Sequence, residues 1–141
     1  MEQEIAIYRD SIDKTMNRVI GRADELMLGK KPESNLSNFV TDVMRQHITA
    51  LAVGCDTLPV PQMALFNIKG IRSVIPKGDI MVKHLFEILP FENEMVLLGL
   101  KGSVVKTLFQ FVANEGGDGL SGASFVFLLV LLVLLLFLPV R

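Results

Sequence analysis

The residues best suited to chemistry in this sequence lie in two short loops within residues 63–93. Asn67 and Arg72 fall in the first loop, and Phe91 and Asn93 fall in the second. An arginine fork binds an anion such as phosphate with two parallel hydrogen bonds, and an aromatic side chain can stack on a flat ring. Because the stretch contains no metal-ligand cluster and no evident proton shuttle, we predict ligand binding there and no catalytic residue.

Each of these residues also has a structural interpretation that the sequence leaves open. Arg72 could instead form an ion pair, and Asn67 could instead hold a turn, since Asn side chains accept hydrogen bonds from nearby backbone. Phe91 lies at a break between a predicted helix and a predicted strand. There an aromatic ring either fills the core or stays exposed as a stacking face, and the sequence alone favours the core.

Composition narrows the function classes. The 141 residues predict one domain, and 14 basic against 15 acidic residues give a formal net charge of −1. Binding of nucleic acid through a basic surface is therefore not expected. The single cysteine, Cys55, cannot form an intrachain disulfide and is predicted to be buried. His47 is expected in or near the core, and no set of residues has the spacing of metal ligands, so no metal site is predicted.

The clearest predicted element is a helix over residues 36–51, where apolar residues recur with the helical period. Ser34 or Asn35 is its predicted N-cap. The other predicted elements are a helix over 2–18, a strand or turn-strand over 19–28, buried strands over 63–68 and 95–100, a helix over 79–89, and a helix that starts at 102 and ends at 116–119. This alternation predicts an α/β (α+β) domain with a mixed sheet flanked by helices.

The last residues differ in character from the predicted domain, which covers 1–124. Fifteen of the sixteen residues over 125–140 are Phe, Val or Leu. A helix over 119–140 would be about 33 Å long, enough to cross a hydrocarbon core of roughly 30 Å. Three interpretations stay open for the tail, residues 125–141: a membrane anchor, a buried strand or an accidental terminus. The acidic N-terminus does not have the pattern of a secretory signal peptide.

Three short motifs, spaced along the chain, resemble motifs of a known protein family. They are Glu-Ser-Asn-Leu-Ser-Asn-Phe-Val-Thr-Asp over 33–42, Met-Ala-Leu-Phe-Asn-Ile-Lys-Gly-Ile-Arg over 63–72, and Leu-Pro-Phe-Glu-Asn over 89–93. From about Ile5 to Phe125 the chain resembles the C-terminal domain of the 5′-nucleotidase/UDP-sugar hydrolase family. The resemblance implies that fold, incomplete at its C-terminal end, and binding of a nucleotide or nucleotide-sugar. It places Asn67 and Arg72 at the phosphate or sugar end of the ligand, with Phe91 stacked on the base and Asn93 hydrogen-bonded to it.

The sequence departs from the family pattern at several positions. Ile68 and Lys69 replace two glycines of the loop that ends in Arg72. Pro32 stands where the family often has an arginine, with Lys30 and Lys31 as the nearest basic residues. Residues 116–119 look like a late family loop that supplies a second stacking ring, but they come too early and are not assigned to it.

The resemblance also implies that substrate binding and catalysis lie in separate domains. In the family, a separate N-terminal metallophosphoesterase domain holds two metal ions that activate water, and this sequence contains no such domain. We therefore predict that this chain is the nucleotide-recognition part of a 5′-nucleotidase-type hydrolase, which acts in nucleotide catabolism. By itself the chain is expected to be inactive and to bind no cofactor. A separately encoded catalytic domain is its predicted partner. The alternative is a non-binding truncated remnant or a membrane-tethered interaction module. The family resemblance implies an extracytoplasmic or periplasmic location, but the missing signal peptide leaves the compartment open.

Overall fold

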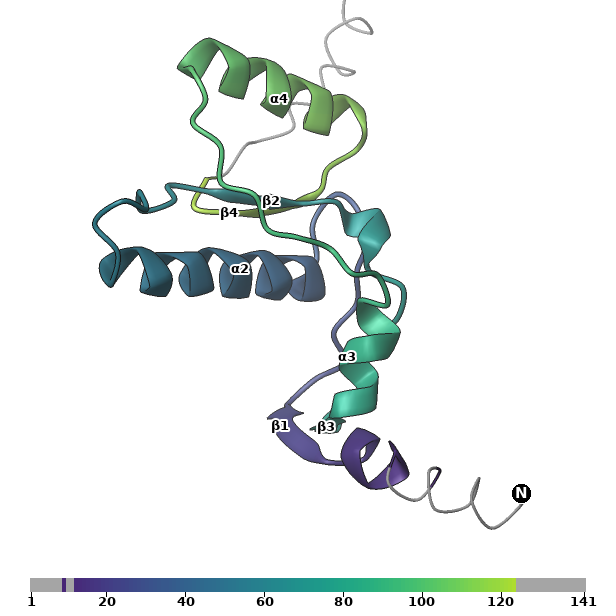
Figure 1. Ribbon diagram of the computed structural model, residues 1–141. Coiled ribbons are helices and arrows are strands. Elements are labelled where there is room, and N and C mark those ends of the chain that lie inside the picture. The colour runs from purple at the N-terminus through teal and green to yellow at the C-terminus, as the bar shows by residue number, and fades with distance from the viewer. Residues whose placement is uncertain (1–8, 10–11, 124–141) are drawn as a thin grey trace, which may run out of the picture.

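Short helices and strands alternate along the computed structural model of this protein, which describes residue 9 and residues 12–123. The chain is helical at residues 12–16, before the first strand. The elements that follow are β1 (Val19–Ala23), α2 (Asn35–Val53), β2 (Ala64–Phe66), the 3₁₀ helix η1 (Ile68–Gly70), β3 (Gly78–Met81), α3 (Val82–Ile88), α4 (Gly102–Asn114) and β4 (Gly119–Ser121) (Figure 1). The predicted mixture of helices and strands is confirmed. The strands form two separate antiparallel pairs, β1–β3 and β2–β4.

The longest helix, α2, begins where the sequence predicts. Ser34 is its N-cap: the Ser34 hydroxyl accepts a hydrogen bond from the backbone N–H of Ser37, and the Ser37 hydroxyl accepts one from the backbone N–H of Ser34. This reciprocal arrangement satisfies backbone donors that the first helical turn leaves unpaired. Leu36 and Thr41 are fully buried, so this side of the helix faces the core.

The β2–β4 pair lies against α2. Leu65 is opposite Leu120, and Phe66 is opposite Gly119. Figure 1 shows α2 on one side of this pair and α4 on the other. Ser121 ties the strand to α2, because its hydroxyl donates to Asp42 Oδ1 and accepts a 2.8 Å bond from Arg45 Nε.

The β1–β3 pair and α3 form a second packed region. Val19 pairs with Met81 and Ala23 with Gly78, with an irregularity in register near the start of β1. The small core here consists of four buried residues with partly buried neighbours: Ala23, Leu36, Ile75 and Ile88. Leu36 comes from α2, so the two regions share this core.

Two predicted elements have different bounds or character in the structure. The helix expected from Asp79 begins at Val82, because residues 78–81 pair with β1 and Asp79 lies opposite Arg22. The predicted buried strand over 95–100 is wrong: these residues form no strand and are exposed, with Val96 74% exposed. An apolar run is buried as a strand only where neighbouring strands pair with it, and residues 95–100 pair with none of the described strands.

Three further expectations concern side-chain burial and the tail. His47 and Cys55 are exposed rather than buried. The narrow β2–β4 pair covers only one side of α2, which carries His47, and Cys55 lies beyond Gly54, the C-cap of that helix. Residues 119–121 form β4, so a membrane helix starting at Gly119 is wrong, and residues 125–141 lie outside the described residues. Within the described part of the chain, every helix is too short or too polar to cross a membrane.

Candidate functional site

The first predicted loop is held in shape by Asn67. The Asn67 side-chain oxygen accepts a 3.0 Å hydrogen bond from the backbone N–H of Lys69 and caps the short helix η1. The Asn67 carbonyl accepts a further 2.8 Å bond from the N–H of Gly70. The turn-holding interpretation of Asn67 therefore applies in this structure, and its ligand contact stays a prediction.

The two residues that replace family glycines fit this turn without difficulty. Ile68 is buried and adds to the core, whereas Lys69 is exposed. Gly70 is different, because a Cβ atom there would lie 3.0 Å from the ring of Phe66. The position where backbone and ring approach most closely is thus the one that remains glycine.

Arg72 follows this turn with its side chain exposed. Its backbone N–H donates a 2.9 Å hydrogen bond to the carbonyl of Ile88, the last residue of α3. Within residues 12–123, no carboxylate pairs with the Arg72 guanidinium, so the structural ion pair that the sequence left open is not formed. A contact between this guanidinium and an anionic ligand stays a prediction.

Phe91 is 55% exposed, and the expectation of a core residue is therefore wrong. Asn93 is exposed as well, and its backbone N–H donates a 3.0 Å hydrogen bond to the carbonyl of Phe91, which closes a tight turn. Phe91 follows Ile88 by three residues, a span of at most about 11 Å. The bond between Arg72 and Ile88 thus places the arginine and the ring on neighbouring loops.

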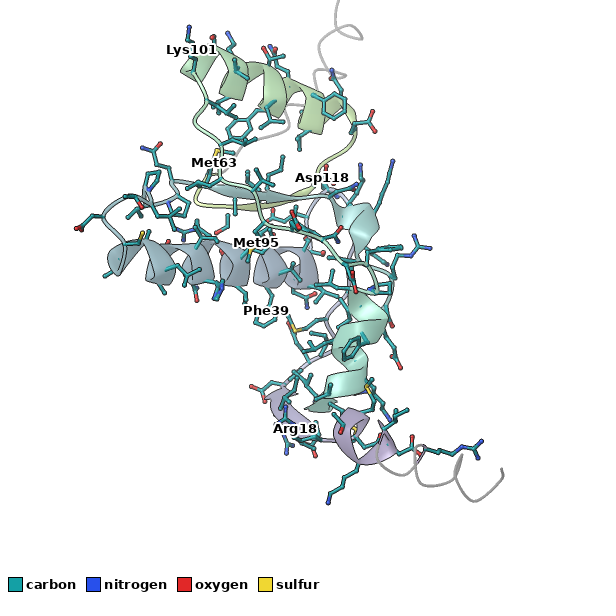
Figure 2. The ribbon with its side chains drawn as sticks, viewed as in Figure 1. Arg18, Phe39, Met63, Met95, Lys101 and Asp118 are labelled. Carbon is teal, nitrogen blue, oxygen red and sulfur yellow. The ribbon has the colours of Figure 1, made fainter. Side chains whose placement is uncertain are left out.

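A third loop, residues 115–118, adjoins the first. The sequence predicted a helix end there, and its likeness to a late family loop was not assigned. Asp118 Oδ1 accepts a 3.0 Å hydrogen bond from the backbone N–H of Ile68, at the start of η1. Figure 2 shows Asp118 at the end of the β2–β4 pair, next to η1. An acidic residue placed directly after two glycines at a helix end was the signal that could have identified it.

The loop before α2 contacts the segment that follows α4. Lys31 Nζ donates to the carbonyl of Glu115, the C-cap of α4, where a cation is favourable. A Cβ atom on Gly117 would lie 2.3 Å from the carbonyl oxygen of Pro32, so the two backbones are in direct contact. Lys31 therefore makes a structural contact through its side chain, and both lysines of this loop, Lys30 and Lys31, are exposed.

The described residues contain no group of three or more His, Cys, Asp or Glu side chains placed to hold a metal ion. His84 has a structural role, because its Nδ1 accepts a 3.1 Å hydrogen bond from the backbone N–H of Met81 before α3. The donor set in this part of the chain does not fit a two-metal centre. The loops place an exposed guanidinium and an exposed aromatic ring on neighbouring segments.

Comparison with known proteins identifies the class of domain to which this arrangement belongs. The family model described as 5′-nucleotidase, C-terminal domain, matches residues 19–128. The chain therefore belongs to the 5′-nucleotidase C-terminal domain family, and the resemblance seen in the sequence is confirmed.

Solved and curated relatives agree with this assignment. The crystal structure of a 5′-nucleotidase precursor from Thermus thermophilus matches with a TM-score of 0.65 and 33% identity, covering 86% of this chain. The trifunctional nucleotide phosphoesterase protein YfkN of Bacillus subtilis is 29% identical over 84% of the chain, and the apyrase of Tabanus yao is 23% identical over 77%. The matched region spans only 24%, 8% and 20% of these relatives, respectively.

Proposed function

We propose that this chain is the nucleotide-recognition part of a 5′-nucleotidase-type phosphoester hydrolase. The observation that carries the proposal is the position of two exposed side chains on neighbouring loops. The Arg72 guanidinium has no carboxylate partner among the described residues, and the Phe91 ring is open to solvent. The hydrogen bond between Arg72 and Ile88 joins the two loops. Such a pair matches the two ends of a nucleotide or nucleotide-sugar, one anionic and one aromatic. The names of the relatives, a nucleotide phosphoesterase and a 5′-nucleotidase, support the same ligand class.

In this proposal each residue has a defined role. Arg72 binds the phosphate oxygens with its fork, and Phe91 stacks on the base. Asn93 offers its side-chain amide to the base edge, and Asn67 contributes its remaining amide hydrogens near the phosphate or sugar. The hydrolytic step belongs to a separate metallophosphoesterase domain, whose two metal ions would supply the activated water. This chain contributes binding and orientation.

Titration calorimetry of the full chain with adenosine 5′-monophosphate (AMP), and with a UDP-sugar, tests the proposal. We expect Phe91→Ala to weaken nucleotide binding about 5- to 140-fold, the range for loss of one base–aromatic stack. Arg72→Ala should weaken binding by a similar factor, about 10- to 140-fold, because it removes hydrogen bonds to a charged group.

Two matched controls separate the site from general effects on the fold. Phe39, on α2, is 47% exposed and so resembles Phe91 in exposure, and Arg22, on β1, is an exposed arginine. Phe39→Ala and Arg22→Ala should leave nucleotide affinity unchanged. The proposal fails if the unmodified chain gives no heat with any nucleotide, or if the controls lose as much affinity as the site variants.

A further inference from the structure

Two exposed lysines lie near Arg72 and come from different parts of the chain. Lys69 is on η1, shortly before Arg72. Lys30 belongs to the loop before α2, and the residue before it, Gly29, packs on the side chain of Ile71. A Cβ atom on Gly29 would lie 2.9 Å from Ile71 Cγ2. Three basic residues from two distant segments therefore gather around Ile71.

The backbone of each of these basic residues is held by a hydrogen bond. The N–H of Lys69 donates a 3.0 Å bond to Asn67 Oδ1, and the N–H of Lys30 donates a 3.0 Å bond to the Ser34 hydroxyl. Arg72 is held in the same way through its own N–H. A ligand that binds the three charged side chains therefore does not have to order the loops first, which lowers the cost of binding.

These charges are not neutralised by ion pairs. Over residues 12–123, no carboxylate lies within ion-pair distance of Lys30, Lys69 or Arg72. The carboxylate of Asp118 lies in the adjoining loop, where it accepts the N–H of Ile68. Taken together, these four side chains leave an excess of positive charge. Cations held close together attract a polyanion more strongly than a single cation does.

We propose that Lys30 and Lys69 are specificity-determining residues that bind a second phosphate, so that the preferred ligand is a nucleoside diphosphate; this inference rests on the proposed function. Phe91 and the two lysines are joined to Arg72 through different neighbours, the end of α3 on one side and Ile71 on the other. The base and the outer phosphate then lie on either side of the guanidinium, in the order that they have along a nucleoside diphosphate. A lysine amine binds phosphate as a point charge.

The arrangement predicts an effect that depends on the ligand. A nucleotide with one phosphate occupies Arg72 and gains little from the lysines, whereas a nucleotide with two phosphates gains from both. Salt screens contacts between exposed charges, so the affinity for the diphosphate should fall more steeply with added salt than the affinity for the monophosphate.

The test is titration calorimetry of the full chain with adenosine, AMP, adenosine 5′-diphosphate (ADP) and ADP-ribose, which share one base. The site variant combines Lys30→Gln with Lys69→Gln, and its charge-retaining counterpart combines Lys30→Arg with Lys69→Arg. Because the bonds at both positions use backbone N–H groups, these substitutions leave them in place. The control combines Lys14→Gln with Lys101→Gln and removes the same charge. Lys14 lies before β1, and Lys101 lies at the start of α4, as Figure 2 shows; both are exposed.

We expect the double glutamine variant at the site to weaken ADP binding about ten-fold, as for two exposed charge contacts, and AMP binding by no more than about two-fold. Adenosine binding should stay unchanged. The double arginine variant and the control should bind ADP as the unmodified chain does. If ADP-ribose shares the gain over AMP, the outer phosphate is accepted with a sugar attached; if ADP alone gains, a free terminal phosphate is required. Either result supports the inference.

Three results would overturn the role of the two lysines. They are an unmodified chain that binds ADP no more tightly than AMP, equal losses of ADP and AMP affinity in the double glutamine variant at the site, and an equal loss of ADP affinity in the control. An unmodified chain that binds none of the four ligands instead refutes the proposed function itself.

Discussion

The contact between Gly117 and Pro32 gives a prediction whose size can be worked out from the backbone. Gly117 has a φ of +99°, and a Cβ atom there would lie 2.3 Å from the carbonyl oxygen of Pro32 and 2.7 Å from its Cα. Both neighbours are backbone atoms, so no side-chain rotation can relieve the overlap. Gly117→Ala therefore combines left-handed strain with a steric clash.

Two other glycines separate these contributions. Gly78 has a φ of +107° with nothing within 4 Å of the added Cβ, so Gly78→Ala introduces strain alone. Gly99 has neither a positive φ nor a neighbour within 4 Å, so Gly99→Ala introduces neither. The three variants differ by one methyl group each and form a matched set.

The expected changes in the free energy of unfolding follow from typical values. Left-handed strain of about 1–2 kcal/mol, less the entropic gain of replacing glycine, gives a loss of about 1 kcal/mol for Gly78→Ala. Overlap with fixed atoms adds about 1–3 kcal/mol, so Gly117→Ala should lose about 2–4 kcal/mol. For a chain of this length the melting temperature should fall by about 5–15 °C for Gly117→Ala and by about 2–4 °C for Gly78→Ala. Gly99→Ala should stay within about 0.5 kcal/mol of the unmodified chain.

Thermal denaturation followed by circular dichroism measures all three variants under the same conditions. If Gly117→Ala loses no more stability than Gly78→Ala, the close contact between Gly117 and Pro32 is refuted. If Gly78→Ala and Gly117→Ala both behave as Gly99→Ala does, the left-handed backbone at these positions is refuted as well.

Two further predictions concern local side-chain contacts. Ser34→Ala removes the N-cap of α2 and should lower the free energy of unfolding by about 1 kcal/mol, measured by urea denaturation; an unchanged stability would contradict the cap. The Thr57 hydroxyl, 3.2 Å from the sulfur of Cys55, lowers the pKa of that exposed thiol by stabilising the thiolate. Thr57→Val should raise the Cys55 pKa toward its ordinary value, so the pH midpoint of alkylation by iodoacetamide should move upward; a midpoint that stays in place or falls would contradict the hydrogen bond.

The local signals in the sequence predict the helices well. The N-cap residue Ser34 and the apolar period beyond it locate α2, and the break at Gly102 locates α4, because caps and periodicity act over one or two turns. The start of α3 was predicted three residues too early. Asp79 resembles a helix cap locally, but its backbone pairs with Arg22 in β1, and a pairing partner so distant in sequence cannot be read from the residues around Asp79.

Burial and loop contacts depend on distant partners and were predicted less well. The apolar run at 95–100 and the side chain of Phe91 were predicted to lie in the core, yet both are exposed in the structure. The motifs correctly singled out the loops that contain Arg72 and Phe91. The bond between Asp118 and Ile68 was not predicted, because the spacing of residues does not reveal a contact across 50 positions.

The pairing of β4 with β2 also has a consequence for the order of folding. The bond from Ser121 to Asp42 spans 79 residues, and the bond from Asp118 to Ile68 spans 50. Contacts of such high contact order form slowly, since a long loop must close before they are made. During synthesis, the bonds of Asp42 and Ile68 to this segment can therefore form only after β4 has left the ribosome, so the loop with Arg72 gains its contact with Asp118 late.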